Sequence, residues 1–301
     1  MRDAVAIQGV TKCYGTVEAV RDVSFSLTPG AVALVGHNGA GKTTLIKLLL
    51  GLIRPTCGTV TVLGENPAVG QFAARRRLGY LPENVSFNAA LTGREILAFY
   101  ARLKGEPVAR SLQLLARVGL EAAASRRVGT YSKGMRQRLG LAQALIGEPE
   151  VLLLDEPTTG LDPALRQSFY EIVAELADRG ATVLLSSHAL SELEARAQRV
   201  IMMDGGRMVA DGSIDQLRRV ARLPVRIRLR ADAGVLALPP GVGPGRVTGP
   251  GVLEIEVPGD RKSEILRALV CGPTAPVDVD VIPPSLDDIY AHFLRAREPS
   301  A

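Results

Sequence analysis

Short apolar runs alternate with longer, periodically apolar segments from the first residues to about residue 212. The runs predict strands over Ala31–Val35, Val151–Asp155, Ala181–Ser186 and Val200–Met203. Each run is apolar at nearly every position, which is typical of strands buried on both faces of a parallel sheet. We therefore expect an α/β fold in which helices cover a mostly parallel sheet.

The pattern changes after Asp211. Helical periodicity over 213–220 is followed by alternating strand patterns over 225–230, 252–257 and 277–282, with helices at 263–270 and after Pro283-Pro284-Ser285. A Gly/Pro-rich stretch interrupts this series between the first two strands. The sequence thus predicts two domains, a large one over 1–215 and a small C-terminal α+β domain over 216–301.

Composition narrows the class of protein. The three cysteines, Cys13, Cys57 and Cys271, are scattered and form no CxxC pair, which argues against a disulfide framework or a zinc site. No uncharged apolar run approaches the ~20 residues of a membrane span, so we expect a cytoplasmic protein. The net charge of +5 comes without basic blocks interleaved with aromatic residues, so we expect no nucleic-acid partner.

A glycine-rich motif follows the strand at 31–35. The segment 36–43 fits G-x-x-x-x-G-K-[ST] and opens a helical segment, the arrangement in which backbone N–H groups cradle phosphates. Lys42 is expected to contact the β- and γ-phosphate oxygens, and Thr43 to bind Mg²⁺. The expected ATP-binding residues here are Gly36, His37, Asn38, Gly39, Ala40, Gly41, Lys42, Thr43 and Thr44.

Acidic residues end the buried strand at 151–155. Asp155 is the expected Mg²⁺ ligand, and Glu156 is the candidate general base for the attacking water. His188 follows the strand at 181–186, where ligands bind in open α/β sheets, and is expected to sense the γ-phosphate. We take Lys42, Glu156 and His188 as the catalytic set.

The segment Tyr131–Arg138 resembles the signature motif of ABC-type ATPases, normally LSGGQ. The resemblance implies a P-loop NTPase of ABC-ATPase type with a helical signature subdomain, a head-to-tail homodimer and two ATP molecules at the seam. It implies that Ser132, Lys133, Gly134 and Met135 act on the nucleotide of the other subunit. Lys133 and Met135 stand where Gly and Gln are usual.

Three further positions match landmarks of the same family. By this resemblance Tyr14 stacks on adenine and Asp162 is the D-loop acid. Glu83 stands where the family usually has Gln, and a carboxylate there is an expected Mg²⁺ ligand. The resemblance covers residues 4 to about 212.

Several longer phrases are similar to the ATPase of the Nos copper-processing transporters. They are GHNGAGKTT, GYLPENVSF, YSKGMRQRLGLAQAL, LPVRIR and PSLDDIYAHFLRA. This similarity implies an integral-membrane permease, a periplasmic maturation protein, and a role in maturing the copper sites of nitrous oxide reductase. The ATPase would then be peripheral on the inner face of the cell membrane.

Two alternatives remain open at this point. The ending PSLDDIY also resembles ATPases of multidrug and antibiotic exporters, which implies a different cargo for the same engine. A soluble ABC ATPase of iron–sulfur assembly is the alternative from another class. A single nucleotide motif and no sustained heptads between Thr44 and Tyr131 argue against translation and DNA-repair ATPases.

Overall fold

The computed structural model describes residues 3–69, 72–194, 196–230, 238–239, 242–272 and 275–296. The chain forms two compact units, residues 1–212 and 213–301. Every helix in the described part of the chain falls short of the length or the apolar character that a membrane span requires.

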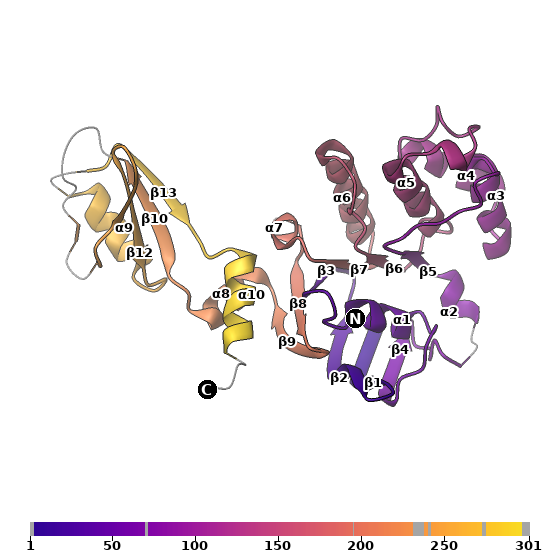
Figure 1. The fold of residues 1–301 in the computed structure, drawn as a ribbon, viewed down its shortest axis with the longest axis horizontal. Coiled ribbons are helices and arrows are strands. Elements are labelled where there is room, and N and C mark those ends of the chain that lie inside the picture. Colours follow the sequence, from indigo (N-terminus) through magenta and orange to yellow (C-terminus); the bar gives the residue numbers. More distant parts are fainter. Residues whose placement is uncertain are drawn as a thin grey trace. The chain divides into compact units, whose positions relative to one another are not determined.

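A six-stranded sheet forms the centre of the first unit (Figure 1). Its first five strands in spatial order pair in parallel, and the last pair is antiparallel. The order is β5 (Leu78–Leu81), β6 (Val151–Asp155), β7 (Thr182–Ser187), β3 (Gly30–Val35), β8 (Arg199–Asp204) and β9 (Arg207–Gly212). Strands β3, β6 and β7 are buried along their whole length, as their apolar sequences predict.

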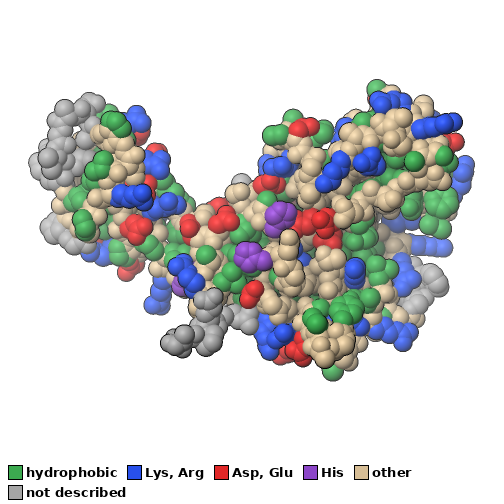
Figure 2. All heavy atoms as spheres, in the orientation of Figure 1, with side chains coloured by type: hydrophobic (Ala, Val, Ile, Leu, Met, Phe, Trp, Pro, Cys, Tyr) green, Lys and Arg blue, Asp and Glu red, His purple; other side chains and the backbone are tan. Residues whose placement is uncertain are grey.

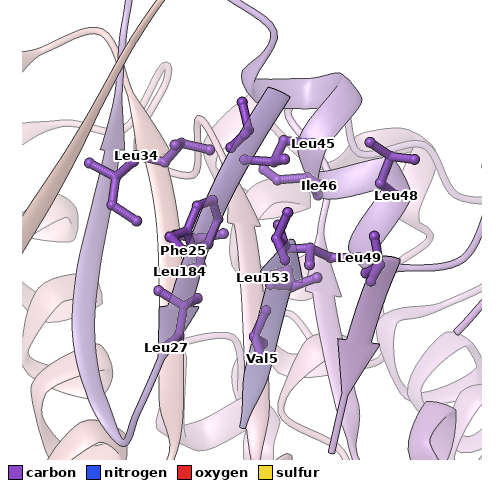
Figure 3. Close-up of a cluster of buried hydrophobic side chains, with 14 of the residues drawn as sticks. Val5, Phe25, Leu27, Leu34, Leu45, Ile46, Leu48, Leu49, Leu153 and Leu184 are labelled. Carbon is purple, nitrogen blue, oxygen red and sulfur yellow. The ribbon is translucent and has the colours of Figure 1, made fainter. Parts of the chain in front are cut away.

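A second, antiparallel sheet lies on the other side of α1 (Lys42–Leu49), as Figure 1 shows. It has the order β2 (Val17–Leu27), β1 (Val5–Tyr14) and β4 (Cys57–Val62). Leu45, Ile46 and Leu49 of α1 fill the space between the two sheets and contribute to one hydrophobic core (Figure 3). This core fixes the position of the helix that follows the phosphate loop.

Helices on the opposite face complete the first unit. Helix α6 (Pro163–Asp178) packs on β3 and β7, whereas α3 (Gly93–Lys104), α4 (Val108–Arg117) and α5 (Lys133–Ala144) pack on one another. A capping box at Thr92 and Glu95 starts α3. The short helices are α2 (Phe72–Arg76), the 3₁₀ turn η1 (Val128–Thr130) and α7 (Leu190–Leu193).

In its described residues, the second unit has a four-stranded antiparallel sheet and three helices. The strand order is β11 (Arg246–Gly249), β12 (Val252–Val257), β10 (Val225–Arg230) and β13 (Asp278–Ile282). Helix α9 (Lys262–Val270) covers one face and buries Ile265 and Leu269 against Ile227, Leu229 and Ile255. Helices α8 (Ile214–Ala221) and α10 (Leu286–Arg295) pack together, and each begins with a capping box.

Candidate functional site

The glycine-rich motif is a tight loop between β3 and α1. Gly41 is the N-cap of α1 with φ 101°, and a β-carbon there would lie 2.5 Å from the backbone oxygen of Ala19. A β-carbon at Gly36 would lie 2.5 Å from the oxygen of Met203. A β-carbon at either position would overlap backbone atoms, so the path of this loop requires glycine at both.

Lys42 is buried with its ammonium folded over this loop. Its Nζ donates to the carbonyl oxygens of Gly36 at 2.5 Å and His37 at 3.3 Å. The same Nζ lies 3.7 Å from Oε1 of Glu156. A buried ammonium is thus held where the loop and the end of β6 meet, which is suited to binding an anion between them.

Glu156 lies in contact with His188. Its Oε2 is 2.7 Å from Nδ1 of His188, and the His188 backbone N–H donates to the same oxygen at 3.4 Å. Glu156 has φ 47°, a left-handed conformation that is strained for a residue with a β-carbon. Its Oε1 is buried and, among the described residues, receives no hydrogen bond. That oxygen is therefore a ready acceptor for a water molecule.

Asp155 and Glu156 are joined through Ser186 at the end of β7. Ser186 Oγ donates to Asp155 Oδ1 at 2.7 Å and accepts the Glu156 backbone N–H at 2.9 Å. The hydroxyl is fully buried and so holds both acids in one arrangement.

The neighbouring Tyr80 hydroxyl stays protonated over the physiological pH range. Burial, reinforced by the charge of Asp155, raises the pKa of Tyr80 to about 12.

These groups surround one cavity of about 400 Å³. Tyr14 stands at its rim, 47% exposed, with Lys12 Nζ 5.2 Å from the ring centroid. Of the expected ATP, metal and catalytic residues, all but Gly36 and Asp155 line this cavity. Ala19 and Thr159 line it too and were not expected. The expected residues that line it are Tyr14, His37, Asn38, Gly39, Ala40, Gly41, Lys42, Thr43, Thr44, Glu83, Glu156 and His188.

The signature segment and Asp162 lie outside the lining of that cavity. Ser132 is the N-cap of α5 and accepts the N–H of Met135 at 3.2 Å. Asp162 caps α6 in the same way, accepting the N–H of Leu165 at 2.9 Å. The Lys133 chain lies over Gly160, where a β-carbon would be 3.0 Å from Lys133 Cδ. Gln137, which was not expected, donates to the Pro157 carbonyl and ties α5 to the segment after β6.

The donors around the cavity fit a Mg²⁺–nucleotide better than a resident metal. Among the described residues, no group of three or more His, Cys, Asp or Glu side chains is placed to hold an ion. The oxygen donors of Thr43 and Glu83 do face the cavity. Mg²⁺ prefers oxygen and is usually held by one or two side chains, substrate phosphates and water. These residues would hold the ion only together with the phosphates.

Comparison with known proteins identifies the family. The ABC transporter family model matches residues 20–159. A daunorubicin resistance ATP-binding protein of Streptomyces coeruleorubidus is 36% identical, over 96% of this chain and 95% of that protein. A Nod factor export ATP-binding protein of Rhizobium etli is 39% identical over 69% of this chain and 68% of that protein.

A solved ATP-binding subunit of an ABC transporter has a similar fold. It shares 32% sequence identity with a TM-score of 0.68, and the match covers 72% of this chain and 92% of that one. The expected ABC-ATPase fold is therefore confirmed. The closer similarity to copper-processing ATPases finds no support in these comparisons, because the two relatives are named for drug resistance and Nod factor export. The chain belongs to the ABC transporter family and is an ATP-hydrolysing transporter subunit.

Proposed function

We propose that this chain powers an exporter of the drug-resistance type, as a homodimer bound to a separate membrane permease at the cytoplasmic face. The observation that carries the proposal is the 36% identity with a daunorubicin resistance ATP-binding protein over 96% of the chain, C-terminal unit included. A role in copper-site maturation with a periplasmic partner has no comparable support. The cargo class proposed is a drug of the daunorubicin type, after the name of that relative.

Catalysis is assigned to the residues around the 400 Å³ cavity. Lys42 would neutralise charge on the β- and γ-phosphates. Thr43, Asp155 and Glu83 would hold Mg²⁺, which would supply further positive charge to the phosphates. Oε1 of Glu156, buried and without a hydrogen bond from the described residues, accepts the proton of the attacking water. His188 holds the carboxylate through Oε2, which leaves Oε1 for the water.

The position of the signature segment supports the proposed dimer. Ser132, Lys133 and Gly134 lie at the N-terminus of α5, outside the cavity of their own chain. A helix N-terminus with small residues is suited to binding phosphate. A second copy in head-to-tail orientation would bring this N-terminus to the γ-phosphate, with Asp162 at the same seam.

The permease is expected to bind an exposed apolar patch on α3. Phe99 is 55% exposed and Leu103 is 69% exposed, one turn apart on the helix. Tyr100 packs edge-on against both Phe87 and Phe99, with ring centroids 6.2 and 5.3 Å apart. Exposed apolar side chains that gather in one patch are typical of a protein interface. An apolar segment of the permease is therefore the proposed occupant.

The variant Glu156→Gln tests the proposed ATP hydrolysis and dimerisation. This change removes the base but keeps a group that can bind His188, so ATP should drive a stable dimer that turns over at least about 100-fold more slowly. Sizing with and without ATP, together with phosphate release, gives both readouts. Glu150→Gln, which alters an exposed carboxylate paired with Arg77, is the matched control. A monomer at saturating ATP would refute the dimer.

The test of the cargo is export by the intact system. The chain and its permease are expressed in a sensitive host, and tolerance to daunorubicin is compared with that of a host carrying Glu156→Gln. Higher tolerance that needs Glu156 supports the proposal. Unchanged tolerance, with nitrous oxide reductase copper loading that needs Glu156, would return the copper-processing role. If the chain co-purified with cytosolic iron–sulfur proteins and not with the permease, it would be a soluble assembly ATPase.

A further inference from the structure

A basic groove of about 1120 Å³ opens in the C-terminal unit. It lies between the end of α8, the turn that joins β12 to α9 and the segment before α10. Its lining carries four cationic side chains and two carboxylates: Arg218, Arg219, Arg222, Lys262, Asp215 and Asp260. Figure 2 shows Lys and Arg spheres gathered beside the position of α8 in Figure 1. We call this surface the α8 groove.

The carboxylates of the α8 groove leave much of its positive charge unbalanced. Asp215 pairs with Arg218 at 3.4 Å, and Arg218 Nε also donates to the Pro284 carbonyl at 3.0 Å. Among the described residues, no carboxylate lies within 4.0 Å of the guanidinium groups of Arg219 or Arg222. Like charges concentrated on a concave surface raise the local concentration of anions.

Arg222 has a backbone conformation that is unusual for arginine. It is the C-cap of α8 and has φ 48°, the left-handed conformation that favours Gly or Asn. Arg218 and Arg219 in the last turn complement the helix dipole, which explains them without a ligand. Arg222 lies beyond the last turn and its backbone is strained, so helix stability does not explain why an arginine stands here.

We propose that the α8 groove binds a phosphate ester of a polyhydroxylated alcohol. Guanidinium groups bind phosphate oxygens through paired hydrogen bonds. Three arginines and one lysine line this groove. Asp215 and Asp260 can accept hydrogen bonds from alcohol hydroxyls, which a bare phosphate lacks. The volume of about 1120 Å³ also exceeds the needs of a single phosphate. The ester is either a free metabolite or the headgroup of a phosphoglycerolipid.

Two probes applied to the full chain distinguish these sources. Glycerol 1-phosphate is titrated by calorimetry, and vesicles of phosphatidylcholine with or without phosphatidylglycerol are tested by flotation. Each probe is compared across wild type, Arg222→Gly, Arg219→Ala and the control Arg267→Ala. Arg267 is exposed in the last turn of α9 and outside the groove lining. Comparison among variants cancels any binding at the phosphate loop.

We expect Arg222→Gly and Arg219→Ala each to weaken binding at least fivefold, and Arg267→Ala to leave it within twofold. Arg222→Gly should also melt no lower than wild type, because glycine favours the left-handed backbone. Loss of binding is then not a loss of folding. Binding of glycerol phosphate alone identifies a free ester, and binding of phosphatidylglycerol vesicles alone identifies a lipid headgroup. Equal effects in all three variants, or binding of neither probe, would overturn the proposal.

Discussion

The Nδ1 atom of His188 lies 2.7 Å from Oε2 of Glu156. The two residues directly follow the neighbouring strands β7 and β6 of one sheet. This contact fixes which oxygen of the carboxylate is available to a water molecule. Glu156 itself is almost fully buried, whereas the His188 side chain is 61% exposed. The histidine can therefore meet a ligand while it orients the base.

His188→Ala should lower kcat by up to about 100-fold with a smaller change in KM for ATP, because the carboxylate loses its orienting partner. Steady-state ATPase assays of the full chain measure both constants. His292→Ala in α10 is the matched control, since it removes a histidine from the other unit. If His188→Ala changed KM alone, its role would be nucleotide binding rather than orientation of Glu156.

Ser186→Ala should destabilise the fold and weaken the use of Mg²⁺. The change leaves the buried N–H of Glu156 without its acceptor and removes the donor to Asp155, at a cost of about 1–3 kcal/mol in unfolding free energy. Urea unfolding and the Mg²⁺ dependence of ATPase activity give the two readouts. Ser168→Ala, an exposed serine on α6, should alter neither. Equal stability of the two variants would show that the Ser186 bridge contributes nothing.

Lys104 gives a pH dependence of stability. Its Nζ donates to the carbonyls of Leu78 at 2.9 Å and Ile146 at 2.8 Å, and burial, partly offset by Glu106, lowers the pKa of Lys104 to about 8. An exposed lysine has a pKa of about 10.4. Between these values the unfolded chain holds a proton that the folded chain has released, so the unfolding free energy rises with pH.

Urea titrations from pH 7.5 to 10.5 check this sign. The stability of wild type relative to Lys104→Met should increase across the window, while the difference relative to exposed Lys47→Met should stay flat. A flat Lys104 difference would mean that the ammonium is as well stabilised in the fold as in water.

The apolar patch on α3 is tested by Phe99→Ser and Leu103→Ser. Each change removes a large apolar side chain worth about 1.5 kcal/mol or more when buried, so permease binding should fall roughly tenfold per residue. Co-purification with the permease measures the loss, and ATPase activity of the isolated chain should stay within twofold. Val247→Ser, which alters a still more exposed apolar residue on β11, should leave co-purification intact. Retained permease binding in both α3 variants would place the interface elsewhere.

Features that lie within one continuous segment of the chain were predictable from the sequence. Features that depend on how distant segments pair were not. The uniformly apolar strands β3, β6 and β7 lie where their composition predicts. The antiparallel sheet of β1, β2 and β4 was missed, because register shifts such as that between Ile7 and Val10 break the alternation that would identify it. Strand β11 was missed within the Gly/Pro-rich stretch, where turn residues hide a short edge strand.

The same distinction applies to the candidate site. The phosphate loop is one continuous motif, so its residues could be named together. Ser186 could not be assigned, because its contact with Asp155 depends on the register that pairs these residues across β6 and β7. The signal available was a polar residue at the carboxyl end of an otherwise apolar strand.

The left-handed backbone of Glu156 has a consequence for engineering. Glu156→Gly would relieve a conformation that costs about 1–2 kcal/mol and would remove a buried carboxylate at the same time. A library selected only for heat resistance would therefore favour chains that have lost their base. Directed evolution of this subunit therefore needs a screen for ATP turnover beside the screen for thermal stability. At position 156 thermal stability favours glycine, whereas turnover requires glutamate.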